Sequence, residues 1–356
     1  MIKGRLVYNK IKAKADGAIF FDEVSSYWLT GFHSTDGVVI VDNTKTLLCV
    51  DSRYVEAARI AKANGELYGD VEVKLLENGV FDAIKAYFKG QTLAFDSSFV
   101  TVARLELLKE KLEGFDFVPL NNICGEFRMV KSADELEKIK AAQAITDAAF
   151  SHILGFIKEG VREREIAAEL EYFVKKNGGD GMAFDTIAVS GSNSSLPHGV
   201  PGDRVIVKNS FITMDFGAKY KGYCSDMTRT VVFGKADDEM KFIYNTVLDA
   251  QLAAIKAAKG NVIGKDIDKV ARDIISAAGY GPNFGHSLGH SLGIEIHESP
   301  NFSPKFDNSI PSGAVMTVEP GIYLEGKYGV RIEDMVYLTD EGNVDLTNSP
   351  KELIEI

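Results

Sequence analysis

Acidic residues inside apolar, extended segments are the feature that most limits how this chain can fold. The stretch Phe211-Ile-Thr-Met-Asp215-Phe-Gly217 predicts a β-strand that carries an aspartate, and Asp226 lies in the next stretch, Tyr223-Cys-Ser-Asp226-Met-Thr-Arg-Thr230. An ionised carboxylate that leaves water is costly unless a group of opposite charge pairs with it. The sequence Gly-Ala-Lys-Tyr-Lys-Gly between the two aspartates predicts a turn, so we expect them to meet across a hairpin.

A second pair of acids occurs downstream in the same kind of context. Glu319 ends the apolar run Val315-Met-Thr-Val-Glu319, and Glu333 follows Gly329-Val-Arg331-Ile. The simplest alternative to a functional site is that Asp226 pairs with Arg229 and that Asp215 lies at a strand end. Four acids in four extended segments nevertheless require cations, which favours a shared binding site for positive charge.

Histidines accompany these acids. The chain has only six, and three of them, His286, His290 and His297, fall within twelve residues beside glycines. One histidine with four carboxylates is an oxygen-rich set that could hold two divalent ions a few ångström apart, as in two-metal hydrolases. Such ligation favours Mn, Co or Fe over a thiolate zinc site, and Mg stays open.

A competing motif overlaps the histidine segment. Gly285-His286-Ser287-Leu288-Gly289 satisfies G-x-S-x-G, which in serine hydrolases joins an apolar strand to a helix. Here Gly281-Pro-Asn-Phe precedes the motif, and glycines 289 and 293 follow it, so neither the strand nor the helix is expected. We therefore set the serine hydrolase aside.

The order of predicted elements divides the chain into two domains. Over residues 1–125 short β-rich runs alternate with helical ones, which is typical of an α/β domain. Strands are expected at 18–21, 38–41, 47–50, 71–76, 92–95 and 115–119, and helices at 53–64, 81–88 and 102–112. Over residues 126–356 helices at 132–160, 163–176, 237–259 and 265–278 cover a largely antiparallel sheet. Ser132-Ala-Asp-Glu135 has the spacing of a capping box at the start of the first of these helices.

Composition narrows the class of protein and its partners. The 40 Lys and Arg residues against 51 Asp and Glu residues give a formal charge of −11, which opposes binding to nucleic acid and to anionic membranes. The three cysteines are too widely spaced for a disulfide framework or a metal clip. Neither a signal peptide nor a membrane-spanning stretch is apparent, so we expect a cytoplasmic protein.

Several short motifs occur together in one order along the chain. They are the pair Asp215 and Asp226, Leu196-Pro-His198-Gly, Gly289-His290, Ile296-His297-Glu298, Val318-Glu319-Pro-Gly-Ile-Tyr323 and Arg331-Ile-Glu333-Asp. In this set the chain resembles the pita-bread metallopeptidases, in the branch of Xaa-Pro aminopeptidases and Xaa-Pro dipeptidases (prolidases). Tyr27-Trp-Leu-Thr-Gly-Phe32 is similar to the creatinase-type N-terminal signature. The resemblance implies a creatinase-type α/β domain at 1–125 and an α+β pita-bread catalytic domain at 126–356.

The resemblance also implies a metal centre. Two divalent ions, Mn in the first place with Co, Fe or Zn as alternatives, would be held by Asp215, Asp226, His290, Glu319 and Glu333. Asp226 and Glu333 would bridge the ions, and Glu319 would also act as general base. Ser291 stands where the family usually has glycine, a departure that leaves all five ligand positions intact.

Further residues receive roles from the same resemblance. His198 and His297 would bind the substrate and the oxygen of the tetrahedral intermediate. His286 would line the proline side, and Arg331 and Tyr323 would support the ligands and the bound substrate. We expect a homodimer, an inference that rests on the resemblance of the N-terminal domain alone.

The activity implied is hydrolysis of the bond before proline in peptides. Our first interpretation is an Xaa-Pro aminopeptidase, and the alternative is an Xaa-Pro dipeptidase, which must capture a free carboxylate next to the proline. His33, Arg53 and residues 299–304 are candidates for that capture, but Asn301 supplies no positive charge, which favours the aminopeptidase. A non-catalytic peptide-binding member of the fold is the remaining alternative, and the complete ligand set argues against it.

Overall fold

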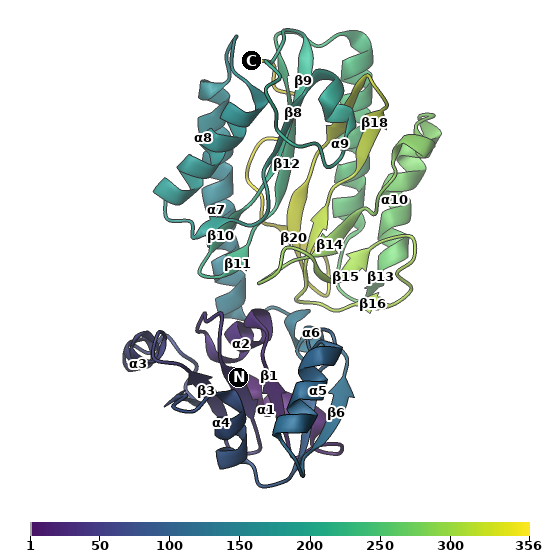
Figure 1. The fold of residues 1–356 in the computed structure, drawn as a ribbon. Helices are drawn as coiled ribbons and strands as arrows, with labels where there is room; N and C mark the ends of the chain where they lie inside the picture. The colour runs from purple at the N-terminus through teal and green to yellow at the C-terminus, as the bar shows by residue number, and fades with distance from the viewer. Residues whose placement is uncertain (1) are drawn as a thin grey trace. The chain divides into compact units, whose positions relative to one another are not determined.

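The chain up to Phe127 is built on one mixed sheet with the strand order β4-β3-β2-β1-β5-β6 (Figure 1). The computed structural model describes residues 2–356. The strands of this unit are β1 (Gly17–Phe20), β2 (Val38–Val41), β3 (Thr46–Val50), β4 (Val71–Leu75), β5 (Thr92–Asp96) and β6 (Asp116–Leu120). Its helices are α1 (Lys3–Ile11), α2 (Glu23–Thr30), α3 (Val55–Ala63), α4 (Val80–Tyr87) and α5 (Val102–Lys111), and α6 (Gly125–Arg128) lies where the chain divides.

Helices cover both faces of this sheet. Strands β1, β2 and β3 are buried along their whole length, as expected for strands without a solvent face. Ile84 of α4 and Phe88, just beyond the end of that helix, join Leu108 of α5 in a cluster with apolar side chains of the strands. Helices α1 and α2 contact β1, β2 and β3. The predicted α/β arrangement and its six strands are confirmed, whereas α1 and α2 are additions to the prediction.

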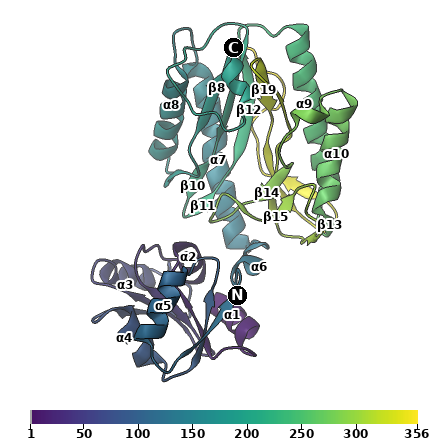
Figure 2. The ribbon, with the colours of Figure 1, turned by 45° about the vertical axis from the view of Figure 1, so that its right-hand side comes forward.

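The unit from Arg128 onward places antiparallel strands between helices (Figure 2). Its long helices are α7 (Ala133–Phe156), α8 (Glu163–Lys176), α9 (Asp238–Ala257) and α10 (Gly264–Ala277). Two 3-10 turns, η1 (Gly191–Ser195) and η2 (Gly281–Asn283), follow β8 and α10 respectively. Its strands are β7 (Gly181–Met182), β8 (Ile187–Ser190), β9 (Ser210–Phe216), β10 (Ala218–Tyr220), β11 (Tyr223–Cys224), β12 (Met227–Phe233), β13 (Val262–Ile263), β14 (Gly289–Ser291), β15 (Glu298–Phe302), β16 (Ser309–Ile310), β17 (Val315–Val318), β18 (Gly321–Leu324), β19 (Tyr328–Arg331), β20 (Asp334–Leu338) and β21 (Asn343–Asp345). The predicted antiparallel pairing is confirmed.

The strands form several small sheets. The first half of the unit has the orders β12-β9-β8 and β11-β10-β7, and the second half has β15-β14-β17-β20-β21, β18-β19 and β13-β16. In both ribbon views α7 and α8 lie to one side of the strands and α9 and α10 to the other (Figures 1 and 2). Among the described residues, no helix combines the length and the apolar character needed to cross a bilayer.

The start of α7 follows the capping rule expected from its sequence. The Ser132 hydroxyl accepts a hydrogen bond from the Glu135 N–H at 3.4 Å, and the Glu135 carboxylate accepts one from the Ser132 N–H at 2.9 Å. This reciprocal pair satisfies two N–H groups that the first turn of a helix otherwise leaves unpaired. α7 can therefore begin immediately after the chain divides.

Replacing Ser132 with alanine is expected to lower the free energy of unfolding by about 1 kcal/mol, because one cap hydrogen bond is lost. Ser151→Ala is a matched control, since Ser151 is exposed on the same helix and bonds only to the carbonyl of Asp147; it should change stability by less than about 0.5 kcal/mol. Urea unfolding monitored by circular dichroism measures both. Equal effects of the two substitutions would contradict the capping role.

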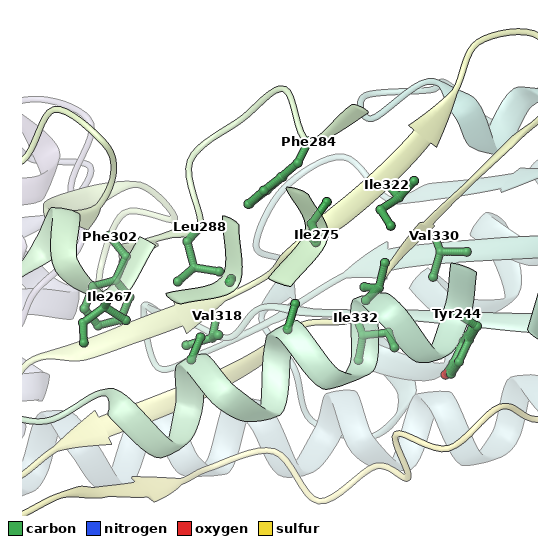
Figure 3. Packing of buried hydrophobic residues seen from close by; sticks show 14 of the residues in the cluster. Tyr244, Ile267, Ile275, Phe284, Leu288, Phe302, Val318, Ile322, Val330 and Ile332 are labelled. Atoms are coloured by element: carbon green, nitrogen blue, oxygen red, sulfur yellow. The ribbon is translucent and has the colours of Figure 1, made fainter. Parts of the chain in front are cut away.

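Two apolar cores hold the C-terminal unit together. One joins α7 and α8 to β8, β9 and β12. The other packs α9 and α10 against the later strands, and Figure 3 shows part of it: Tyr244, Ile267, Ile275, Phe284, Leu288, Phe302, Val318, Ile322, Val330 and Ile332. Because the strands that end at the candidate site have a packed core behind them, their ends are rigidly placed.

Candidate metal centre

Strand ends bring the predicted acids together. Asp215 lies on β9 opposite Thr228 of β12, and Asp226 immediately precedes β12. The predicted meeting of the two aspartates across paired strands is thus confirmed, although the short strands β10 and β11 occupy the connection. Glu319 follows β17, and Glu333 lies between β19 and β20. All four carboxylates therefore come from segments that leave a strand at the same cavity.

Two glycines allow the backbone to approach closely enough for this convergence. A Cβ atom on Gly217 would lie 1.8 Å from the carbonyl oxygen of Ser225, so no other residue fits between the two aspartates at that point. A Cβ atom on Gly289 would lie 2.0 Å from the carbonyl oxygen of Thr317. Glycine at this second position lets β14 carry His290 alongside β17, whose end carries Glu319.

His290 faces the acids through one ring nitrogen. Its Nε2 lies 3.6 Å from Asp226 Oδ2 and 3.4 Å from Glu319 Oε1, and its Nδ1 lies 3.1 Å from the Ser291 carbonyl oxygen. Nδ1 therefore donates to that carbonyl, which leaves the Nε2 lone pair directed at the carboxylates. One ligand atom each from Asp226, His290 and Glu333 lie within 4.8 Å of one another.

Two carboxylate oxygens of this group are buried without a hydrogen-bond partner: Asp215 Oδ1 and Glu333 Oε1. The other oxygen of each is fixed, because Arg331 Nη2 donates to Asp215 Oδ2 at 2.5 Å and the Thr228 hydroxyl donates to Glu333 Oε2 at 2.7 Å. A buried oxygen left unpaired costs roughly 1–3 kcal/mol, and more when it is charged. Asp215 and Glu333 are thus each held through one carboxylate oxygen, while the second oxygen has no partner among the described residues.

The crowding of these acids disfavours their charged forms. Burial raises the pKa of Asp226, and the neighbouring charges of Glu333, Asp215 and Glu319 raise it further. Burial, followed by the charges of Glu319 and Asp215, also raises the pKa of Glu333, and burial raises the pKa of Glu319 to about 8. Burial lowers the pKa of His290 to about 4, so its imidazole is neutral at pH 7.

This donor set fits divalent metal ions. Several carboxylates and one neutral imidazole form the hard, oxygen-rich ligation that Mn²⁺, Co²⁺ and Fe²⁺ accept. A cation among them would pair with the two orphaned oxygens and would offset the repulsion that raises the pKa values of Asp226 and Glu333. The residues present therefore satisfy the chemistry expected of the predicted metal ligands.

The remaining predicted residues line the same cavity, which has a volume of about 730 Å³. His198, His286, His297 and Arg331 all contribute to its wall, and the His297 ring lies 4.5 Å from the His290 ring. Tyr323 reaches the wall through hydrogen bonds: Arg331 Nη1 donates to its oxygen at 2.7 Å, and the hydroxyl lies 3.0 Å from His286 Nε2.

Alternation along β12 separates two groups of charges. Thr228 points toward Glu333, whereas its neighbour Arg229 points to the opposite side and forms a buried ion pair with Asp334 at 2.7 Å. Successive side chains of a strand face opposite ways, so Asp226 and Arg229, three residues apart, cannot share a face. The alternative pairing of Asp226 with Arg229 is therefore wrong.

Some predicted candidates lie elsewhere. In the N-terminal unit, His33 stacks on Tyr27, and Arg53 pairs with Asp36 and Asp51. Asn301 is the candidate for carboxylate capture that lines the cavity. The serine of the G-x-S-x-G sequence lies in the loop between η2 and β14, so the described chain does not place it in a strand-turn-helix elbow.

Sequence reasoning missed residues that orient the predicted ones. Thr228 and Thr317 each bond a site carboxylate through their hydroxyl groups, and Thr317 also accepts the His290 N–H at 3.0 Å. Both threonines lie in strands two residues from a predicted acid, Asp226 or Glu319, so they share its face. That spacing is the signal that could have identified them.

Both units of the chain match families of known proteins. Residues 137–340 match metallopeptidase family M24, and residues 10–130 match the Creatinase/Prolidase N-terminal domain. An Xaa-Pro dipeptidase of Pyrococcus furiosus is 38% identical over 93% of each chain. Among solved structures, an Xaa-Pro dipeptidase from Bacillus anthracis has a TM-score of 0.92 at 39% identity and covers 99% of this chain and 98% of its own. An X-Pro aminopeptidase from Thermotoga maritima has a TM-score of 0.90 at 38% identity and covers 99% of both chains.

Proposed function

The chain belongs to metallopeptidase family M24, and on that premise we propose that it is an Xaa-Pro dipeptidase that works with two divalent metal ions. The expected combination of a creatinase-type N-terminal domain with a pita-bread catalytic domain is confirmed. The observation that carries the proposal is the convergence of four acids and His290, with two orphaned oxygens, in one cavity. Relatives similar over nearly the whole chain and named Xaa-Pro dipeptidase support the choice of substrate.

The first interpretation of the sequence, an Xaa-Pro aminopeptidase, has less support and becomes the second candidate. Two observations favour it: the Thermotoga maritima structure, and the uncharged Asn301 in the cavity wall. A dipeptidase needs a group that receives the free carboxylate after proline, whereas an aminopeptidase must leave that side open to a longer chain. The two candidates therefore differ in the length of substrate they accept.

For the metal centre we propose that Asp215, Asp226, His290, Glu319 and Glu333 would hold the two divalent ions. When bound, such ions supply a nucleophile at neutral pH and polarise the carbonyl of the scissile bond. Arg331 holds Asp215 in place through Oδ2, and Thr228 holds Glu333 through Oε2. These contacts leave the second oxygen of each acid available to a cation.

The other residues act on protons and on the substrate. In the proposed mechanism Glu319, oriented by the Thr317 hydroxyl at 3.0 Å, accepts a proton from the attacking water and passes it toward the leaving nitrogen. His297 and His198 donate hydrogen bonds to the oxyanion and to the region of the scissile amide.

His286 has a fixed orientation in this scheme. Its Nδ1 donates to the Ser287 carbonyl at 2.8 Å, so Nε2 accepts from the Tyr323 hydroxyl. Burial lowers the pKa of His286 to about 4, so it presents a neutral ring at pH 7. A neutral, immobile ring suits the apolar proline better than a charged one.

Purified protein loaded with Mn²⁺ is expected to hydrolyse Xaa-Pro dipeptides faster than Xaa-Pro-Xaa tripeptides. A chelator should abolish both activities, because the acids alone repel one another and supply no activated water, and added Mn²⁺ or Co²⁺ should restore them. Liberated amino acids are measured by chromatography, with an Xaa-Ala dipeptide as the control substrate. Cleavage of tripeptides alone would replace the dipeptidase by the aminopeptidase, and full activity in chelator would refute a metallopeptidase mechanism.

Three finer properties of the protein are part of the proposal. We propose Mn²⁺ as the working metal, a homodimer in solution and a cytoplasmic location. Metal analysis of the protein isolated without added ions and light scattering of the purified protein test the first two, and fractionation of cells tests the third.

A further inference from the structure

Glu163 is a buried acid outside the metal centre. It is the first residue of α8, and its side chain is completely buried. Arg204 Nε lies 4.0 Å away, beyond hydrogen-bond distance. Instead, Ser190 donates to Oε1 from its backbone N–H at 2.7 Å and from its hydroxyl at 2.9 Å. Asn193 Nδ2 lies 3.2 and 3.1 Å from the two oxygens, and the Gly202 N–H donates to Oε2 at 3.2 Å.

These donors belong to the two ends of one loop, residues 190–202. Ser190 is the last residue of β8, Asn193 lies in η1, and Gly202 ends the loop. The backbone adds a parallel contact, because the Arg164 N–H donates to the Gly202 carbonyl at 3.1 Å. A buried carboxylate that accepts several N–H groups is held strongly, since each unmade bond would leave a buried polar group unpaired. Glu163 therefore closes the base of the loop.

The other side of the loop reaches the candidate active site. The carbonyl of Pro197 accepts a hydrogen bond from Arg331 Nη1 at 3.2 Å, and His198 lines the cavity. The side chain of His198 is exposed. The backbone of the loop, rather than packing around the ring, therefore sets where this imidazole lies.

We propose that Glu163 is a positioning residue that holds the loop 190–202 so that His198 meets the substrate, an inference that rests on the proposed function. Glu163 contacts neither substrate nor ligand in this scheme and acts through the loop. The role is separate from that of Arg331, which contacts the same loop from the cavity side.

The test is Glu163→Gln, which keeps the shape of the side chain but offers one acceptor oxygen, and directs an NH₂ group at N–H donors. Glu165→Gln is the matched control in the same helical turn: Glu165 is exposed, and its carboxylate accepts only the Arg162 N–H, a cap that glutamine can also make. Asn193→Ala removes the same contact from the loop side and serves if Glu163→Gln does not fold.

Amide hydrogen exchange tests, without any substrate, whether Glu163 holds the loop 190–202. Exchange of residues 190–202 should become faster in Glu163→Gln and Asn193→Ala, and stay as in the wild type in Glu165→Gln. If no Xaa-Pro substrate is cleaved, the proposed function is refuted. The exchange measurement still decides whether Glu163 holds the loop. Unchanged exchange of residues 190–202 in both Glu163→Gln and Asn193→Ala would overturn the inference.

Kinetics then test the connection to His198. In Mn²⁺-loaded enzyme, kcat/KM should fall about 10- to 100-fold in Glu163→Gln, mainly through kcat, as expected for a catalytic group moved by about 1 Å. In a His198→Ala background the same substitution should cost less than about twofold, because the group it positions is gone. Metal content should be unchanged. An equal loss of activity in both backgrounds, or no loss in either, would overturn the positioning role.

Discussion

Replacing Glu333 with glutamine is expected to remove bound metal and peptide hydrolysis together while leaving the metal-free protein at least as stable as the wild type. Glu333 is 1% exposed, and its Oε1 has no partner among the described residues. The amide cannot supply the negative charge that divalent ions need from a ligand. Activity should therefore fall by more than the roughly 10- to 100-fold loss that is typical of removing a residue hydrogen-bonded to a metal ligand. In the metal-free protein the same change relieves repulsion from Glu319 and Asp215.

The opposite effects on the two states make this prediction specific. Metal content is measured by mass spectrometry, activity with an Xaa-Pro dipeptide, and stability by thermal unfolding in chelator. Glu325→Gln is the control, since Glu325 is an exposed acid in the turn between β18 and β19, just before the strand that Glu333 follows. A Glu333→Gln protein that keeps two metals and full activity would refute the ligand assignment. One that unfolds in chelator at a lower temperature than the wild type would indicate a mainly structural role.

The second large effect is expected behind the metal centre, at Arg229. This guanidinium is 1% exposed, pairs with Asp334, and donates to the carbonyl oxygens of Thr228, Glu333, Pro350 and Ser349. Arg229→Met should lower the free energy of unfolding by about 3–5 kcal/mol, because it breaks a buried ion pair, leaves Asp334 with Lys351 as its cation, and leaves buried carbonyl groups unpaired.

A surface pair whose lysine lies just beyond β12 provides the comparison. Lys235, whose side chain is 80% exposed, pairs with Glu355, so Lys235→Met should cost less than about 1 kcal/mol. Urea unfolding of metal-free protein measures both changes without a contribution from bound ions. If Arg229→Met and Lys235→Met unfolded at the same urea concentration, the buried network would not stabilise the fold as described.

Local signals predicted the elements that depend on local contacts. The capping box of Ser132 and Glu135 begins α7 where expected, and α8 has the predicted bounds, Glu163–Lys176. Helix α2 escaped prediction because it is buried on nearly all sides and shows no amphipathic period. Asp22, which accepts the Ser25 N–H as N-cap, was the available signal for its start. Helix α1 was not predicted either; it is nine residues long, and its Lys3 is buried over the rings of Trp28 and Tyr68.

The acids of the candidate site could be found from sequence because carboxylates in apolar strands are unusual wherever they occur. His290 was singled out among the three clustered histidines only by the resemblance to the metallopeptidases. The partners of Asp215 and Glu333 could not be assigned in the same way, since each comes from a distant segment. Arg331 pairs with Asp215, more than a hundred residues away, and Glu163 accepts from Gly202, which follows α8, β7 and β8. Only the folded arrangement decides which cation or donor each buried acid receives.

The alternation along β12 has a consequence for how this segment can change in evolution. Thr228 faces Glu333 in the cavity, while Arg229 faces Asp334 in the core behind it. Inserting or deleting one residue between Asp226 and Thr228 would exchange the two faces, placing a guanidinium among the metal ligands and a small hydroxyl against a buried acid. Both the reaction and the fold would fail at once. We therefore expect a change in the length of this short stretch to be tolerated less well than the substitution of one side chain in it.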